Sequence, residues 1–111
     1  MPESEEEELL DELVRGWVEV YKKSATTLVL LRLIAEAVEA DTSTIAETLA
    51  QRTGWEHTER GLYRALRRLR GLGLLSVREQ PGHRTGAQRH LYGLTDRGAG
   101  YLHRIESALI D

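Results

Sequence analysis

The sequence predicts a mainly α-helical fold with one small β-hairpin, and three observations support this prediction. Apolar residues recur at helical spacing in several separate segments. An amphipathic helix is followed by a second helix that has one apolar and one arginine-rich face. Two strand-like segments then flank a loop that contains Pro81, Gly82 and Gly86. This order is that of a winged helix-turn-helix, here extended by a helix at each end for dimerisation.

Residues 1–23 predict an acidic N-terminal dimerisation helix. Glutamates 5–8 lie at its start and two lysines near its end, the order that complements the helix dipole. This segment has no counterpart in a minimal winged-helix unit, so we expect its apolar stripe to contact a second subunit. The stripe consists of Leu10, Leu13, Val14, Trp17 and Tyr21.

Residues 24–95 are expected to form the winged helix-turn-helix domain. Its first short helix lies in TSTIAETLAQRTG, where Ile45 and Leu49 share one face. Thr44 and Glu47 have the spacing of a capping box, which predicts that this helix begins at Thr44.

The segment from His57 to Leu75 predicts the second helix of the unit. At about 100° per residue its leucines gather on one side, opposite an arc of arginines. Thr58 is placed to cap the first turn. Guanidinium groups suit phosphate oxygens and guanine edges, so we predict a DNA-recognition helix. For this helix in isolation, a merely solvated basic face is an equal alternative. The arginines are Arg60, Arg64, Arg67 and Arg68.

The residues after this helix strengthen the nucleic-acid hypothesis. LLSVREQ and RHLYGLT predict a hairpin, and its basic tip has few acidic neighbours in the sequence. Such a wing suits a phosphate backbone or a minor groove. The basic residues of the wing are His83, Arg84, Arg89 and His90.

The residues of the predicted recognition helix are expected to contact different parts of the DNA. Arg60 and Arg64, near the helix start, are predicted to read bases, because that end of a recognition helix enters the groove most deeply. Arg67 and Arg68 are predicted to hold phosphates. Tyr63, at the border of the polar face, is expected either to bind a phosphate or to pack beneath the helix.

Residues 96–111 predict a C-terminal dimerisation helix that runs from Asp96 to Ile110 with Thr95 as its cap. Its apolar stripe also needs a partner, so we expect the terminal helices of two subunits to pack together. A twofold homodimer would present two recognition helices about 34 Å apart to a pseudo-palindromic operator. The stripe consists of Leu102, Ile105 and Leu109.

Two motifs resemble the PadR family of transcriptional repressors. ERGLYRALRRLRGLGLL is similar to that family's recognition helix, and RHLYGLTDRG is similar to the segment after its wing. The resemblance covers about residues 21–103 and implies a repressor that occupies an operator until it is released. It also implies that a small-molecule effector, where one exists, binds near the dimer interface, with Trp17 and Tyr21 as candidate walls by position. Packing within the apolar stripe is the favoured alternative for these aromatic residues.

The chain departs from the family pattern in three places. A segment similar to HGYEL is absent where this chain has AVEADTSTIAETL. Arg64 stands where the family usually has proline, and Arg70 where it often has glutamate. The recognition helix is therefore more basic than usual, and the DNA sequence it reads is expected to differ.

Composition limits the remaining choices. The 111 residues suit one small domain, and the net charge of −3 conceals a strong segregation of charge. Residues 1–50 carry four basic and twelve acidic side chains, a net charge of −8, whereas residues 51–111 carry eleven basic and six acidic, a net charge of +5. The chain has no cysteine and no apolar run long enough for a membrane, so a soluble cytoplasmic protein is expected.

Other functional classes are less well supported by the sequence. The four histidines are scattered, and neither a metal-binding cluster nor a nucleophile motif is present, so we expect no enzyme, no cofactor and no metal. The stronger alternative is a winged-helix module that binds another protein instead of DNA. Such a module would expose apolar anchors on the recognition helix rather than arginines.

Overall fold

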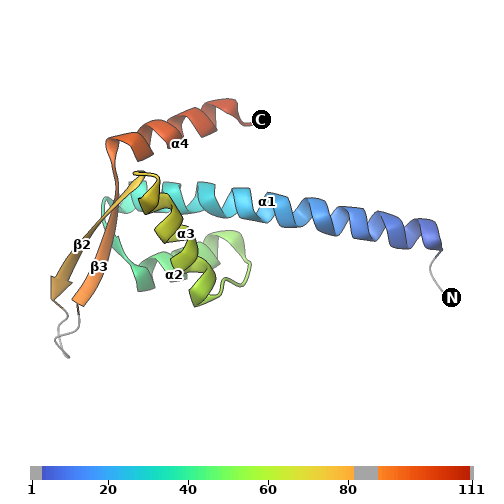
Figure 1. Cartoon of the computed structure of the whole chain (residues 1–111), viewed down its shortest axis with the longest axis horizontal. Coiled ribbons are helices and arrows are strands. Elements are labelled where there is room, and N and C mark those ends of the chain that lie inside the picture. The colour runs from blue at the N-terminus through green and yellow to red at the C-terminus, as the bar shows by residue number, and fades with distance from the viewer. Residues whose placement is uncertain (1–3, 82–87, 111) are drawn as a thin grey trace.

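A computed structural model describes residues 4–81 and 88–110 of the chain and shows one long helix joined to a compact body (Figure 1). The long helix, α1 (Glu5–Ala37), has 33 residues and continues without interruption past residue 23. Its N-terminal part projects away from the other elements (Figure 1). The expected division at residue 23 therefore does not coincide with a break in secondary structure.

The compact body confirms the predicted class, mainly helical with a small hairpin. The hairpin strands pair in antiparallel register, with Val77 opposite Tyr92. Helices α2 and α4 lie on opposite sides of α1 (Figure 1). In chain order after α1, the elements are β1 (Ala40–Asp41), α2 (Thr42–Thr53), α3 (Glu59–Gly71), β2 (Leu75–Pro81), β3 (Gln88–Leu94) and α4 (Asp96–Ala108).

The sheet contains one strand that the sequence pattern did not predict. The short strand β1 pairs antiparallel with β3, so that β3 is central in the order β1-β3-β2. Ala40 lies opposite Tyr92, and Asp41 opposite Leu91. This pairing attaches the start of α2 to the base of the wing.

The core is built where the C-terminal part of α1 meets α2 and α3. Leu31 and Ile34 of α1, Leu49 of α2 and Leu66 of α3 are fully buried. Burying a leucine or isoleucine side chain contributes about 1.5–3 kcal/mol, so this cluster is the main source of stability. The core thus uses the C-terminal part of α1 and leaves the N-terminal part of that helix outside it.

Side-chain caps define the start of three helices in the compact body. Thr58 and Thr95 cap α3 and α4 as predicted, each accepting a hydrogen bond from the amide three residues later. The prediction of a capping box at Thr44 is wrong. Helix α2 begins at Thr42, and its N-cap is Asp41, whose carboxylate accepts a hydrogen bond of 2.8 Å from the Thr44 amide. Asp41 is extended, as an N-cap requires, and its pairing with β3 holds it there.

Helix α4 ends at Ala108, slightly before the predicted Ile110. Within residues 4–81 and 88–110, no helix combines the length and apolar character needed to cross a membrane.

Candidate nucleic-acid interface

Helix α3 separates an apolar face from a basic face, as its sequence predicts. Leu62, Leu66 and Leu69 are buried against the core. The guanidinium groups on the other sides are exposed, and in the described ranges none of them forms an ion pair with a carboxylate. This face therefore carries guanidinium groups that form no ion pair with an acidic side chain in the described part of the chain. The exposed arginines of α3 are Arg60, Arg64, Arg67, Arg68 and Arg70.

The basic face of α3 has two distinct flanks. On the α1 flank, Arg68 donates a hydrogen bond of 3.3 Å to the hydroxyl of Thr27. On the sheet flank, burial raises the pKa of Tyr92, and the nearby charges of Arg70 and Arg67 act in the opposite direction. Arg60 and Arg64 lie between these flanks, opposite the buried leucines. The predicted base readers thus occupy the middle of the exposed face.

Arg70 is a basic residue of this surface that the predicted site omitted. It lies on the sheet flank near Tyr92, in the last turn of α3. The sequence did carry a signal, because Arg70 is seven residues after Tyr63 and so falls on nearly the same side of the helix.

The basic side chains in the described part of the wing are less available for binding than the sequence indicated. The guanidinium of Arg89 pairs with the carboxylate of Asp41 at 2.6 Å, and His90 lies 3.4 Å from Glu79. The sequence has few acidic residues near the wing, but the fold brings Asp41 from a distant part of the chain to Arg89, and the hairpin register places Glu79 opposite His90. His83 and Arg84 lie outside the described residues.

Arg78 on β2 is also paired with a carboxylate. Its guanidinium donates two hydrogen bonds, of 2.7 and 2.9 Å, to the carboxylate of Glu39. This pairing lowers the pKa of Glu39 and raises that of Arg78. Both acidic partners of the sheet arginines, Glu39 and Asp41, come from the short segment between α1 and α2.

A hollow of about 420 Å³ lies between the start of α2, the middle of α3 and the wing. Tyr63 from α3 lines it with 39% of its surface exposed. Ser43 from α2 and His90 from β3 also line it. The hydroxyls of Tyr63 and Ser43 are donors of the kind that holds a phosphate oxygen. Tyr63 thus has both a packed and an exposed side, consistent with either role expected from the sequence.

The predicted dimer stripe of α1 is exposed along its length. Leu10, Leu13 and Val14 are more than half exposed, and Trp17 is 68% exposed. Tyr21 is 52% exposed, and two further apolar residues, Leu9 and Val20, extend this surface. An uninterrupted apolar surface of this kind on a helix is typical of a contact site.

The predicted stripe of α4 divides between the core and the surface. Leu102 is only 8% exposed and packs in the core of its own chain, so it has little surface left for a partner. Ile105 is half-buried against the same core, whereas Leu109 is exposed. Tyr101 and Ile110 are exposed residues that the predicted stripe omitted.

Aromatic side chains connect the projecting part of α1 to the turn between α2 and α3. The rings of Trp17 and Tyr21 stack with centroids 5.4 Å apart, and Tyr21 meets Trp55 edge to face at 6.2 Å. The ammonium of Lys22 lies 5.6 Å from the centre of the Trp55 ring. These contacts tie the turn before α3 to α1.

Two packed helices, a basic exposed helix face and an antiparallel hairpin together define a winged helix-turn-helix protein. Residues 30–104 match the family described as the transcriptional regulator PadR-like family. The chain therefore belongs to the PadR-like family of transcriptional regulators.

Solved structures agree with this assignment. A PadR family transcriptional regulator from Eggerthella lenta is 25% identical, with a TM-score of 0.73 over 89% of this chain and 84% of that one. A PadR-like transcription factor from Bacteroides fragilis is 24% identical, with a TM-score of 0.70 over 84% of this chain and 87% of that one. The Bacillus subtilis PadR, solved in complex with operator DNA, is 22% identical, with a TM-score of 0.67 over 77% of this chain and 48% of that one. No curated protein matches the chain in sequence.

Proposed function

We propose that this protein is a homodimeric repressor that binds a pseudo-palindromic site in double-stranded DNA. The observation that carries the proposal is the exposed face of α3, where Arg60, Arg64 and Arg67 have no acidic partner in the described ranges. A similarly folded protein, the Bacillus subtilis PadR, has been solved with operator DNA. Repression would follow from occupancy, because a dimer on a promoter excludes the polymerase.

Within this proposal, α3 enters the major groove with its N-terminal end. Arg60 and Arg64 read base edges there, since a guanidinium donates two parallel hydrogen bonds to guanine. Arg67 binds a phosphate on the sheet side, and Arg68 binds one on the α1 side, where it exchanges its bond to Thr27 for the phosphate. Thr58 orders the first turn of the helix by capping it.

The homodimer is supported by the exposed apolar surface of α1. This surface faces solvent over several turns in a single chain, and a second copy offers the same apolar side chains to cover it. Trp17 lies near the centre of the stripe. We expect the wild-type protein to sediment as a dimer and Trp17→Asp to shift it toward monomer, because the charge is unfavourable in an apolar contact.

The control for the dimer experiment is Arg15→Ala on the same helix. Arg15 is exposed and lies about 200° from Trp17 around the helix axis, away from the stripe. Sedimentation equilibrium should leave this variant dimeric. A wild-type protein that is monomeric at micromolar concentration would contradict the dimer.

An effector site within the proposed dimer region is supported by a groove of about 650 Å³ between α1 and α4. Tyr21 and Leu28 line one side, and Tyr101 and Ile105 the other. Trp17 does not line the groove but stacks on Tyr21. A small molecule that releases the operator would bind here, where it touches both helices proposed for dimerisation.

The DNA-binding proposal is tested by fluorescence anisotropy. Duplexes selected from a random-sequence library, and the DNA upstream of the gene, are each compared with a scrambled duplex of equal length at two salt concentrations. Tighter and salt-sensitive binding to a selected duplex supports a sequence-specific regulator. Equal binding to every duplex would contradict sequence specificity. No binding at low salt would favour the protein-interaction module instead.

A further inference from the structure

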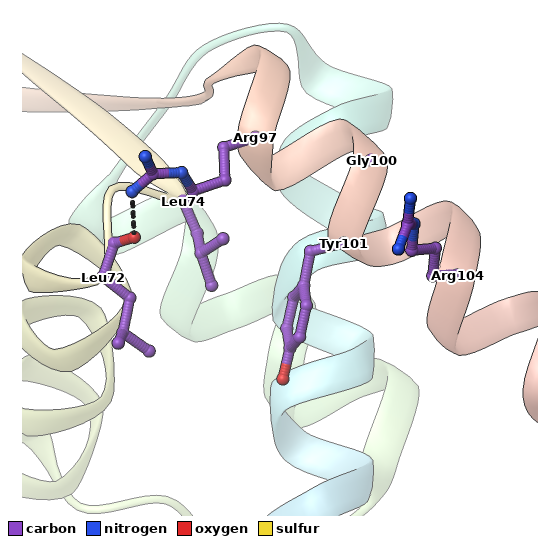
Figure 2. A pocket seen from close by; sticks show the side chains of 6 residues that line it. All are labelled: Leu72, Leu74, Arg97, Gly100, Tyr101 and Arg104. Carbon is purple, nitrogen blue, oxygen red and sulfur yellow. Dashed lines mark hydrogen bonds between the residues drawn. The ribbon is translucent and has the colours of Figure 1, made fainter.

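The C-terminal end of α3 is joined to the first turn of α4 by a side chain of α4. The guanidinium Nη1 of Arg97 donates a hydrogen bond of 3.0 Å to the carbonyl oxygen of Leu72, the C-cap residue that follows α3 (Figure 2). The last carbonyls of a helix have no partner within the helix, and its C-terminal end favours positive charge. Arg97 therefore provides a hydrogen-bond donor for a carbonyl at the end of α3 and places a positive charge at the negative end of the helix dipole. It does so from a position 25 residues after Leu72 in the chain.

Thr95 adds two more bonds between the same two segments. Its hydroxyl donates to the carbonyl of Gly73 at 2.6 Å, and its amide donates to the carbonyl of Leu74 at 3.1 Å. The same hydroxyl accepts the amide of Gly98 at 3.0 Å, which begins α4. One threonine thus starts α4 and holds the residues that follow α3.

Two glycines make this close approach sterically feasible. Gly73 has a φ of +78°, and a Cβ atom there would lie 2.6 Å from Nη1 of Arg97. A Cβ atom on Gly98 would lie 2.1 Å from the carbonyl oxygen of Leu74. A side chain at position 98 would push the two backbones apart, whereas one at position 73 would displace the Arg97 guanidinium and be strained by the positive φ. The contact therefore depends on glycine on both sides.

We propose that Arg97 is a positioning residue, which holds α3 at a defined angle to α4 without touching DNA. Leu72 lies 12 residues after Arg60, which is about 18 Å along the helix, so Arg97 is far from the residues proposed to read bases. Because α4 carries part of the proposed dimer surface, this contact links subunit pairing to the direction of α3. The inference rests on the DNA-binding function proposed above.

Arg104 provides a matched control on the same helix. Arg97 and Arg104 both line a hollow of about 410 Å³ between α3 and α4, together with Tyr101 (Figure 2). Both arginines are exposed, but the hydrogen bond to α3 comes from Arg97 (Figure 2). Substitution of either one removes the same charge from the same hollow, and only Arg97→Ala removes the contact with Leu72.

The first test compares DNA binding by the two variants across a series of salt concentrations. Arg97→Ala should weaken binding to a selected duplex about fivefold, the lower end of typical coupling between two sites. The slope of log affinity against log salt should remain unchanged, because no phosphate contact is lost. Arg104→Ala should bind as the wild type does. Arg97→Lys keeps one donor and the charge, and should recover part of the affinity.

The second test measures amide hydrogen exchange in the protein without DNA. The amides of Leu72 and Gly73 donate to the carbonyls of Arg68 and Arg70 in the last turn of α3. Arg97→Ala should speed exchange at these amides, because the end of α3 is released. Arg104→Ala should leave their exchange unchanged.

The two tests separate the possible failures. A salt slope that falls by about 1 for Arg97→Ala would overturn the positioning role and show a direct phosphate contact. Wild-type affinity and exchange in Arg97→Ala would also overturn it. If the wild-type protein binds no duplex, the proposed function fails. The exchange comparison would then still decide whether Arg97 holds the end of α3.

Discussion

The arginines of α3 and those of the sheet have the same chemistry but different surroundings. In the described ranges, Arg64 and its neighbours on α3 form no ion pair, whereas Arg78 and Arg89 are paired with Glu39 and Asp41. Both groups are equally prominent in the sequence, where only Glu79 interrupts a basic run from Arg60 to Arg89. Arginine density therefore identifies the basic region, but it does not show which guanidinium groups are available to a nucleic acid.

The difference follows from where each element lies in the fold. Helix α3 has the core on one side only, so its outer face points away from other elements. Strand β3 is central in the sheet, and its neighbour β1 belongs to the acidic segment between α1 and α2. The sheet arginines consequently hold the wing to the body, while the α3 arginines remain available for binding.

The largest effect is expected from a substitution in the unpaired group. Arg64→Ala should cost about 1–3 kcal/mol of binding free energy on a selected duplex and relax its sequence preference, because a base contact is lost. Anisotropy titrations against the selected duplex and its single-base variants measure both quantities. Arg104→Ala is the control with the same loss of charge. Unchanged affinity in Arg64→Ala would show that unpaired arginines are not the binding group.

A second prediction concerns Asp41, which holds both Arg89 and the start of α2. Hydrogen bonds from Thr44, together with Arg89, hold the pKa of Asp41 below its ordinary value. Asp41→Ala should lower the free energy of unfolding at pH 7 by about 1 kcal/mol, because α2 loses its cap. The measurement is urea denaturation of both proteins at several pH values.

The pH dependence of this effect has a definite sign. The folded pKa of Asp41 is lower than the unfolded one, so its stabilisation is present above the unfolded pKa of about 3.9. It is lost as the pH falls through the folded pKa, and the curves for wild type and Asp41→Ala should converge in acid. Asp41→Asn keeps a capping oxygen and should be less destabilised at pH 7. A gap that is independent of pH would contradict the role of the carboxylate charge.

The smallest effect is expected from the paired group. Arg78→Ala should change DNA affinity by less than about twofold, because its guanidinium is already bound to Glu39 and exposed pairs contribute little. Melting temperature and anisotropy titrations check stability and binding in the same samples. A loss of DNA affinity as large as that caused by Arg64→Ala would contradict the distinction between the two groups of arginines.

Local features of the fold and the site were predictable from short stretches of sequence. Thr58 and Thr95 act on amides three residues away, so their capping could be read directly. The buried leucines of α3 followed from helical periodicity. The same reasoning placed the cap of α2 wrongly. Asp41 and Thr44 each have a possible amide partner three residues later, so local spacing does not distinguish between them. Only the pairing of β1 with β3 favours Asp41.

The apolar stripes show a similar limit. Leu13 and Leu102 both occupy one face of an amphipathic helix, and the sequence assigned both to a dimer contact. The structure buries Leu102 in the core of its own chain and leaves Leu13 exposed. Periodicity identifies the face that must be covered, but it does not say whether the cover comes from the same chain or another.

The sequence by itself determined the order of helices and hairpin, the two faces of α3 and the position of the basic region. The tertiary structure decided that Arg78 and Arg89 are paired, that Asp41 caps α2 and that Arg97 holds the end of α3. The reason is the range of the interactions. Helical periodicity and caps act over three or four residues, whereas the two sheet ion pairs join residues 39 and 48 positions apart, which only the completed fold brings together.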